Sequence, residues 1–229
     1  MKFLLSNDDG INARGLAALL EAAMEFGECV VAAPAGPQSG MSHAVTWEGG
    51  VRLEERAAGR FAVHGTPADC ARLGLLHVAP DANWILSGIN HGANLGADVY
   101  YSGTVAAVRE AALHGWPGIA FSQYHKAGAS PPDWARATLW TSRVLAELLP
   151  REPEPGRFFN VNFPWLSADM PEPEIVFCPL DSNPLPLSYH HEDGAHFHDG
   201  VYFERPRTPG ADLDTCFRGH IAITEMRLF

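Results

Sequence analysis

The chain has 229 residues, 46% of them hydrophobic, which is enough to fill the core of one α/β domain. Its formal net charge is −11 and no run of lysine or arginine occurs, so the protein as a whole would repel a long phosphate backbone. Nucleic-acid polymers are therefore excluded as expected partners. A small phosphorylated substrate is compatible with this charge, because a bound divalent cation reverses the local sign.

The four cysteines are scattered without a CxxC pair, which argues against structural zinc and against a disulfide scaffold. No stretch approaches the roughly 18 to 20 apolar residues of a membrane-spanning helix. Residues 1–10 also lack a basic region followed by a long apolar segment. We therefore expect a cytoplasmic protein with no membrane partner.

The N-terminal region predicts a βαβ unit. Residues 3–5 form an apolar run typical of a buried strand, and residues 29–33 form a second, partly β-branched run. Apolar side chains recur at helical spacing over residues 15–26, which indicates an amphipathic helix between the two strands. The carboxyl ends of these strands are then expected at one edge of a sheet.

Two adjacent carboxylates, Asp8 and Asp9, follow the first expected strand. Open α/β folds bind ligands at this edge of the sheet, and carboxylate oxygens suit magnesium, manganese or calcium. Asn, Asp and Gly are also the residues that ordinary turns prefer. Taken alone, the pair favours the turn interpretation.

Two later loops are expected to leave the sheet at the same edge. Residues 35–43 are rich in glycine and hydroxyl groups, and Ser39 and Ser42 could reach a metal ion or a phosphate there. A solvated loop is the alternative. Residues 84–86 predict another buried strand, followed by a glycine-rich loop in which Asn90 and Asn94 offer neutral oxygen ligands or amide donors.

The segment between these loops predicts short strands at residues 43–47, 51–53 and 61–63, as a small antiparallel excursion. Thr66 and Pro67 then predict the start of a helix, with Asp69 in its first turn. Capping alone explains these residues, so no chemistry is assigned to them.

A second helix start is chemically richer. Ser102, Gly103 and Thr104 precede an expected helix over residues 105–113. Two hydroxyls, free backbone N–H groups and the positive end of the helix dipole would favour an anion such as phosphate. A plain capping sequence is the alternative.

The remainder predicts a strand at residues 118–122, a helix over 133–149 capped by Asp133, and strands at 158–161, 175–177 and 221–224. Residues 180–206 are expected to form a protruding hairpin. It carries His190, His191, His196 and His198, for which a solvated hairpin tip is the commoner explanation and a zinc or nickel site the alternative.

Several of these segments together resemble the SurE family, the stationary-phase survival proteins. They are residues 7–10 (NDDG), 39–40 (SG), 65–70 (GTPADC), 87–90 (SGIN) with Gly92, Asn94 and Gly96, and 101–105 (YSGTV). The match spans roughly the first 125 residues. Arg14 and His43 depart from the usual pattern, and the region beyond Pro164 matches weakly.

The resemblance implies a Rossmann-like three-layer α/β/α fold, with a mostly parallel sheet and a protruding C-terminal β-hairpin in a single domain of residues 1–229. It implies a metal-dependent phosphatase that removes phosphate from nucleoside 5′- or 3′-monophosphates and from short polyphosphate. Metal ligands would be Asp8, Asp9, Ser39 and Asn90, holding Mg²⁺ or Mn²⁺. Catalysis would rest on Asp8, Asp9 and Asn90, and substrate binding on Ser42, Asn94, Ser102, Gly103 and Thr104. Homodimers or homotetramers would form through the hairpin.

Three points stay open in the sequence. Asp9, His43 and His91 are all candidates for the general base. An aspartyl-phosphate phosphatase would need a DxD pattern and a distal lysine, whereas the carboxylates here are adjacent and lysines are nearly absent. A non-catalytic sensor that binds metal and nucleotide without turnover is the remaining alternative.

Overall fold

Nine strands form one central sheet in the computed structural model, which describes residues 1–126, 128–129, 131–151, 154–167 and 169–229. The strand order is β3-β4-β2-β1-β5-β6-β7-β11-β8. The bounds are β1 (Lys2–Ser6), β2 (Glu28–Pro34), β3 (Leu53–Ala57), β4 (Arg60–Val63), β5 (Trp84–His91), β6 (Gly118–Gln123), β7 (Arg157–Phe163), β8 (Ile175–Phe177) and β11 (Ile221–Arg227).

The centre of the sheet is parallel, as predicted. Strand β1 pairs in parallel with β2 on one side and with β5 on the other, so Leu5 lies opposite both Val31 and Leu86. Strands β5, β6 and β7 continue in parallel, whereas β3 and β11 run antiparallel to their neighbours β4 and β7. The chain leaves β1 in one direction and returns on its other side, which creates a topological switch point between β1 and β5.

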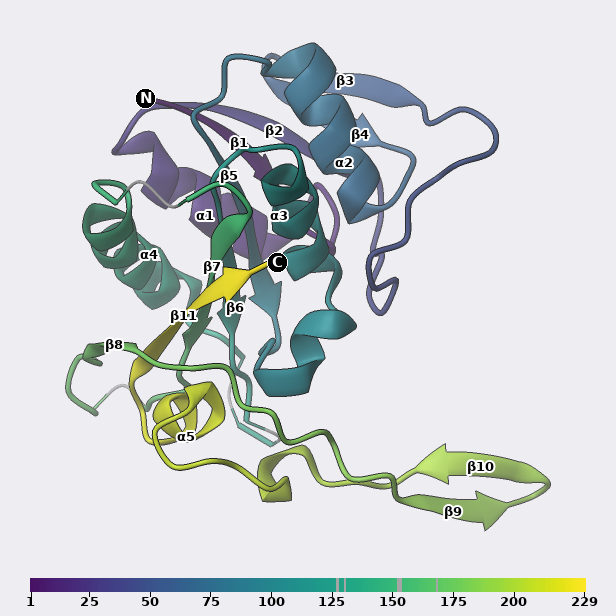
Figure 1. The fold of residues 1–229 in the computed structure, drawn as a ribbon, viewed down its shortest axis with the longest axis vertical. Helices are drawn as coiled ribbons and strands as arrows, with labels where there is room; N and C mark the ends of the chain where they lie inside the picture. The colour runs from purple at the N-terminus through teal and green to yellow at the C-terminus, as the bar shows by residue number, and fades with distance from the viewer. Residues whose placement is uncertain (127, 130, 152–153, 168) are drawn as a thin grey trace.

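Helices cover both faces of this sheet and give the expected three layers (Figure 1). The helices are α1 (Arg14–Met24), α2 (Pro67–Leu73), α3 (Gly103–Leu113), α4 (Trp134–Leu148) and α5 (Asp212–Phe217). Helices α1 and α4 pack together on one face, and α2 and α3 pack together on the other. Phe3 and Leu5 of β1 belong to the core beneath α1 and α4, and Leu4 belongs to the opposite core, so β1 is buried on both sides.

The antiparallel excursion is confirmed, but its predicted first strand at 43–47 is wrong, and the strand predicted at 51–53 lies instead at Leu53–Ala57. Residues 43–47 form a loop, and the strands that pair are β3 and β4. Thr46 donates from its backbone N and its hydroxyl to the carboxylate of Asp69, at 3.0 and 2.7 Å. The same carboxylate and Thr66 form the capping box of α2, so this stretch is held by a helix end instead of a strand.

Helix α5 was not predicted. It has six residues, too few for a helical period to show, and it buries Leu213 and Cys216 against the end of the sheet. Short segments of other helical type are a π-helix at Gly74–Val78 and 3₁₀ turns at Gly96–Tyr100 and Tyr202–Glu204. No helix among the described residues is long and apolar enough to cross a membrane.

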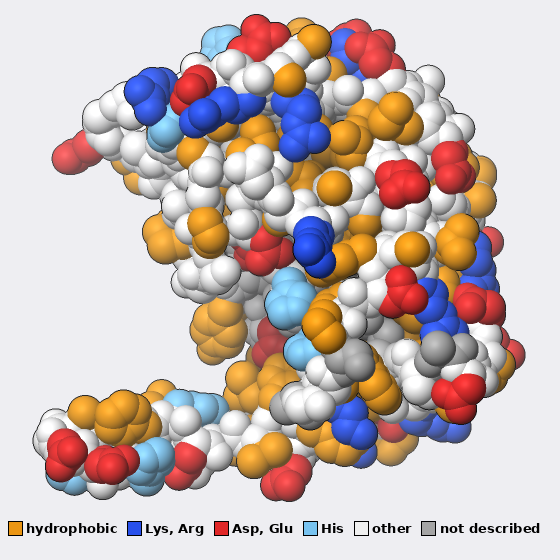
Figure 2. All heavy atoms as spheres, turned by 180° about the vertical axis from the view of Figure 1, so that it is seen from behind, with side chains coloured by type: hydrophobic (Ala, Val, Ile, Leu, Met, Phe, Trp, Pro, Cys, Tyr) orange, Lys and Arg blue, Asp and Glu red, His pale blue; other side chains and the backbone are white. Residues whose placement is uncertain are grey.

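The protruding hairpin is present as a separate two-stranded sheet of β9 (Tyr189–Glu192) and β10 (Ala195–His198). Asp193 and Gly194 both adopt positive φ at its tip, as a two-residue hairpin turn of type I′ requires. Every residue of the two strands is exposed. The hairpin extends away from the body of the molecule (Figure 1), with histidine, acidic and apolar side chains mixed along it (Figure 2).

Candidate functional site

The turn after β1 is closed by Asn7 and Gly10. The Asn7 side chain donates to the Gly10 carbonyl at 2.9 Å and accepts from the Gly10 N–H at 3.2 Å. Gly10 has a φ of +99°, and a Cβ there would lie 3.1 Å from the backbone of Gly36. The hydrogen bonds of these two residues close the turn, so the turn does not depend on the carboxylates of Asp8 and Asp9.

Asp8 lies against the start of α3. Its side chain is 5% exposed, and Oδ1 accepts a 2.5 Å hydrogen bond from the hydroxyl of Thr104. A Cβ on Gly103 would lie 2.8 Å from the Asp8 Cβ, so the close approach of strand end and helix end needs glycine at this position. The predicted carboxylate and the predicted phosphate loop are therefore in direct contact.

Burial raises the pKa of Asp8, and the bond from Thr104 opposes this effect in part. The negative charge of Asp9 raises the pKa of Asp8 further. A divalent cation would relieve both the loss of solvation and the repulsion between the two carboxylates. The electrostatics of the pair therefore fit a cation site.

Asp9 connects the ends of β1 and β5. Its Oδ2 accepts a 3.0 Å hydrogen bond from the backbone N–H of His91. The ring of His91 lies beside that of His125, with centroids 5.4 Å apart. Asp9 thus faces the switch point, where open α/β sheets bind ligands.

Asn90 lies on β5, directly after an irregularity in its pairing with β6. The β5–β6 register shifts between Ser87 and Asn90, and Gly88 adopts a φ of +132° at the shift. The Asn90 amide nitrogen donates to the Gly92 carbonyl at 2.8 Å, so its oxygen is the atom available to a cation. A neutral amide oxygen suits a hard ion.

Asn94 is at the centre of a buried polar network. Its backbone N–H donates to Asn162 Oδ1 at 2.8 Å, and its carbonyl accepts from Asn160 and Asn162 at 2.8 and 3.0 Å. Its own amide nitrogen donates to the hydroxyl of Ser122 at 2.8 Å. These bonds anchor the β5 loop to β6 and β7. Sequence reasoning missed the three partners, because nothing in their spacing marks them.

The start of α3 shows both roles considered for it. The Ser102 hydroxyl accepts from the Val105 N–H at 3.0 Å, which confirms the capping role. The first N–H groups of a helix have no intrahelical partner, and the dipole is positive at this end. Capping by Ser102 and anion binding at this end are therefore compatible.

The hydroxyl-rich loop reaches the site through its backbone. Gln38 N donates to the Asp8 carbonyl at 2.7 Å, and Ser39 follows as an exposed residue. Ser42 lies further along the loop. Its hydroxyl donates to the Tyr100 carbonyl at 2.6 Å, and its backbone N–H donates to the Tyr101 carbonyl at 3.2 Å. Ser42 therefore joins this loop to the segment that leads into Ser102.

Glu110 on α3 is a buried charge that sequence reasoning missed. It accepts hydrogen bonds from Arg72 at 2.5 Å and from His43 at 2.8 Å. Burial opposes ionisation, but the bonds from His43 and Arg72 overcome it and lower the pKa of Glu110 to about 2. The His43 ring is thus engaged by Glu110, which leaves Asp9 and His91 beside the switch point as general-base candidates.

The histidine cluster does not converge. His191 and His196 are paired across the hairpin with ring centroids 5.0 Å apart, whereas His190 stacks on Phe197 and His198 meets Tyr189 edge to face. Among the described residues, no group of three or more His, Cys, Asp or Glu side chains could hold a metal ion. The predicted cation site has only two such residues and completes its set with neutral oxygens, a composition typical of magnesium sites.

The fold and these contacts define an open α/β protein with an acidic cluster and a helix N-terminus at its switch point. The profile of the family described as Survival protein SurE matches residues 3–183. A protein of Nostoc sp. (strain PCC 7120), named as a candidate 5′-nucleotidase, is 48% identical over 228 residues and covers 100% of both chains. The chain belongs to the SurE family.

Two further relatives extend the comparison. The 5′-nucleotidase SurE of Citrifermentans bemidjiense is 35% identical over 251 residues, covering 100% of this chain and 93% of its own. The crystal structure of the SurE protein from Aquifex aeolicus superposes with a TM-score of 0.85 at 27% identity, covering 100% of this chain and 94% of its own. The likeness therefore continues well beyond the first 125 residues, where the sequence motifs ended.

Proposed function

We propose that the protein is a divalent-cation-dependent phosphomonoesterase that hydrolyses nucleoside 5′-monophosphates to nucleoside and phosphate. The observation that carries this proposal is the contact between Asp8 and Thr104, which sets the carboxylate pair against the N-terminus of α3. An anionic ligand group and an anion-binding helix end side by side suit a phosphate bridged to a cation. The names of the relatives supply the nucleotide class.

Asp8, Asp9, Ser39 and Asn90 would hold the cation, with Mg²⁺ or Mn²⁺ as the expected ion. Such an ion neutralises phosphoryl oxygens and lowers the pKa of a bound water. The oxygen donors of these residues fit it, because burial and the charge of Asp9 raise the pKa of Asp8, and a cation would oppose both effects. Nucleoside 3′-monophosphates and short polyphosphate are included in the proposed substrate range.

The protein's own groups have distinct parts in this proposal. The first N–H groups of α3, with Ser102 and Thr104, orient the phosphate along the helix dipole. The Asp9 carboxylate, which accepts a 3.0 Å hydrogen bond from the backbone N–H of His91, and the His91 ring are the proposed candidates for taking a proton from the attacking water. Asn94 supports the loop that carries Asn90.

The proposal is tested by phosphate release from nucleoside monophosphates with Mg²⁺ or Mn²⁺, for the native protein and for Asp8→Asn. We expect a loss of at least about a hundredfold in the variant, since it removes a charge that acts on the reacting phosphate. Asp81→Asn is the control, because Asp81 is an exposed acid that pairs with Lys2 away from the candidate site.

Chelator should abolish the activity of the native protein, and added Mg²⁺ or Mn²⁺ should restore it. Activity of Asp8→Asn near that of the native protein would contradict the proposal. Tight nucleotide binding without turnover under every metal tested would instead support the non-catalytic sensor.

We further propose that residues 180–206 join copies of the chain into a homodimer or homotetramer. A two-stranded sheet that packs neither face against the rest of its own chain gains little stability from burial. Leu187 is 91% exposed at its base, and Tyr189 and Phe197 are exposed on its strands. Apolar side chains in this setting are typical of a surface that another copy covers.

A cytoplasmic location is proposed from the cysteines. All four are free, and Cys70, Cys178 and Cys216 are buried. Burial raises the pKa of the Cys29 thiol to about 11, and the pKa values of the buried thiols are raised as well. Unpaired, unreactive thiols fit a reducing compartment.

A further inference from the structure

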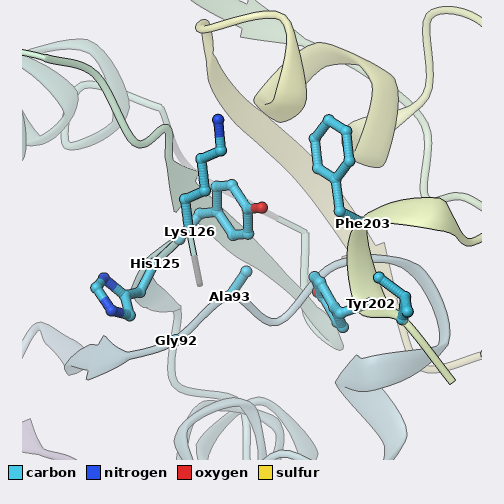
Figure 3. A pocket seen from close by; sticks show the side chains of 8 residues that line it. Gly92, Ala93, His125, Lys126, Tyr202 and Phe203 are labelled. Carbon is cyan, nitrogen blue, oxygen red and sulfur yellow. The ribbon is translucent and has the colours of Figure 1, made fainter. Parts of the chain in front are cut away.

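A cavity of about 420 Å³ opens beside the predicted cation site. None of the residues assigned above to the cation or the phosphate lines it. Its lining includes Gly92, Ala93, Tyr124, Lys126, Tyr202 and Phe203. Figure 3 shows Lys126 and Phe203 on opposite sides of the cavity, with Gly92 and Ala93 below them. The cavity is therefore built from the ends of β5 and β6 on one side and from the base of the hairpin on the other.

One wall of this cavity is a cluster of aromatic rings. Tyr124 and Phe203 both pack on Phe217 of α5, with centroids 4.9 and 5.0 Å apart, and Tyr202 lies 6.3 Å from Tyr124. Phe203 remains 46% exposed, although Phe217 and Arg207 contact it. A ring that is held by its neighbours and still open to solvent is a platform for a flat ligand.

The cavity is continuous with the predicted catalytic residues. Gly92 lines it and accepts the hydrogen bond from the Asn90 amide, and Gly92 N donates to the Gln123 carbonyl at 3.0 Å. Ala93 also lines it and precedes Asn94. Gly92 and Ala93, which lie between Asn90 and Asn94 in the chain, thus line the cavity, so a ligand bound at Asn90 can extend into it.

A buried ion pair holds the aromatic wall to the phosphate loop. Asp98 accepts a 2.6 Å hydrogen bond from the Tyr202 hydroxyl and two 2.9 Å bonds from Arg205. The backbone carbonyl of Asp98 in turn accepts from the N–H of Ser102 at 3.1 Å. The distance between the wall and the start of α3 is thereby fixed by a short chain of bonds.

We infer that this cavity binds the nucleobase of the substrate, by stacking on Phe203 with Lys126 opposite as a hydrogen-bond donor to the base. The inference rests on the proposed function for the position of the phosphate. Nucleobases are flat, polarisable and rich in acceptor atoms, which matches an aromatic wall faced by a cation. Phe203 is the specificity-determining residue in this assignment.

The test compares adenosine 5′-monophosphate with ribose 5-phosphate, which has the same phosphate and sugar but no base. Phe203→Ala should raise KM for the nucleotide roughly tenfold with little change in kcat, because stacking on one ring has about this effect on affinity. Ribose 5-phosphate should be hydrolysed equally by both proteins. Phe203→Leu should resemble Phe203→Ala, since it keeps apolar bulk but removes the aromatic face.

Phe177→Ala is the matched control. Phe177 is 44% exposed on β8 and has an arginine guanidinium over its ring, as Phe203 does, but it does not line the cavity. This variant should hydrolyse both substrates as the native protein does. Light scattering on each variant shows whether a change in assembly accompanies a change in kinetics.

Equal effects of Phe203→Ala on both substrates, or no effect on either, would overturn the inference. A fall in assembly size with equal kinetic effects would show that the wall is an interface between copies. If no phosphate ester is hydrolysed by the native protein, the proposed function fails. Calorimetry with adenosine then tests separately whether the cavity binds a nucleobase. Adenosine binding that Phe203→Ala weakens would support the cavity assignment, and equal or absent binding would refute it.

Discussion

Thr104 and Asp8, 96 positions apart in the chain, are joined by a 2.5 Å hydrogen bond between hydroxyl and carboxylate. One residue begins α3 and the other follows β1, so the bond connects the expected phosphate-binding and cation-binding parts of the site. Because Thr104 contacts Asp8 itself, a change at Thr104 should alter the cation affinity as well as the binding of phosphate.

Thr104→Val should weaken both functions. Valine has the same shape but cannot donate, so a buried carboxylate oxygen loses its partner at a cost of about 1–3 kcal/mol. We expect weaker Mg²⁺ binding by calorimetry, a higher KM and a lower melting temperature. Thr104→Ser, which keeps the hydroxyl, should restore most of each property. Unchanged cation affinity in Thr104→Val would show that the bond does not tune Asp8.

Gly103→Ala should disrupt the contact between β1 and α3. The added Cβ would lie 2.8 Å from the Asp8 Cβ and 3.0 Å from Pro67, both in packed surroundings. Overpacking of this kind costs about 1–3 kcal/mol, and displacing Asp8 should also lower phosphatase activity. Gly50→Ala is the control, because a Cβ there meets nothing within 4 Å. Chemical denaturation and the phosphate assay measure the two effects, and an alanine variant as stable and active as the native protein would contradict the packing argument.

Acid should remove the stabilisation that Glu110 provides. Against the opposing effect of burial, His43 and Arg72 lower the pKa of Glu110 from 4.5 to about 2, so the carboxylate stabilises the fold above pH 4.5. This contribution, about 3 kcal/mol, is lost as pH falls from 4.5 through 2. The difference in unfolding free energy between the native protein and Glu110→Gln should therefore be largest near pH 7 and shrink toward zero near pH 2. Urea denaturation across this range measures it, and a constant difference would refute the ion pair.

Charge on the hairpin should break the proposed assembly. Tyr189 and Phe197 are exposed on β9 and β10, so glutamate at both positions should leave the folded body intact while opposing contact with another copy. Light scattering should then report a mass near the 24.8 kDa of one chain. Leu139→Glu, at an exposed position on α4, is the control and should keep the native mass. An unchanged mass in the hairpin variant would exclude the hairpin as the joining element.

The parallel centre of the fold and the edge that carries the candidate site were predictable. Strands β1, β2 and β5 are marked by apolar runs that end abruptly in polar residues, and parallel strands place their carboxyl ends together. A short-range pattern also predicted correctly that Ser102 caps the N-terminus of α3. The same reasoning failed at residues 43–47, where alternation without a pairing partner produced a loop.

The partners that hold the site were not predictable, because they act across long separations. Asn160 and Asn162 reach Asn94 from β7, and Glu110 reaches His43 across 67 positions. A buried polar group needs a partner, but its own sequence neighbourhood does not say which residue supplies it.

The sequence by itself determined that Asp8 and Asp9 end a buried strand and that a capped glycine-containing helix start follows later. Only the tertiary structure decided that these two segments touch, because the contact depends on the parallel pairing of β1 with β5 at the switch point and on the absence of a Cβ at Gly103. The adjacent Asp pair looked more like a turn than a site. The structure assigns the turn to Asn7 and Gly10 and leaves both carboxylates at the edge of the sheet where open α/β folds bind ligands.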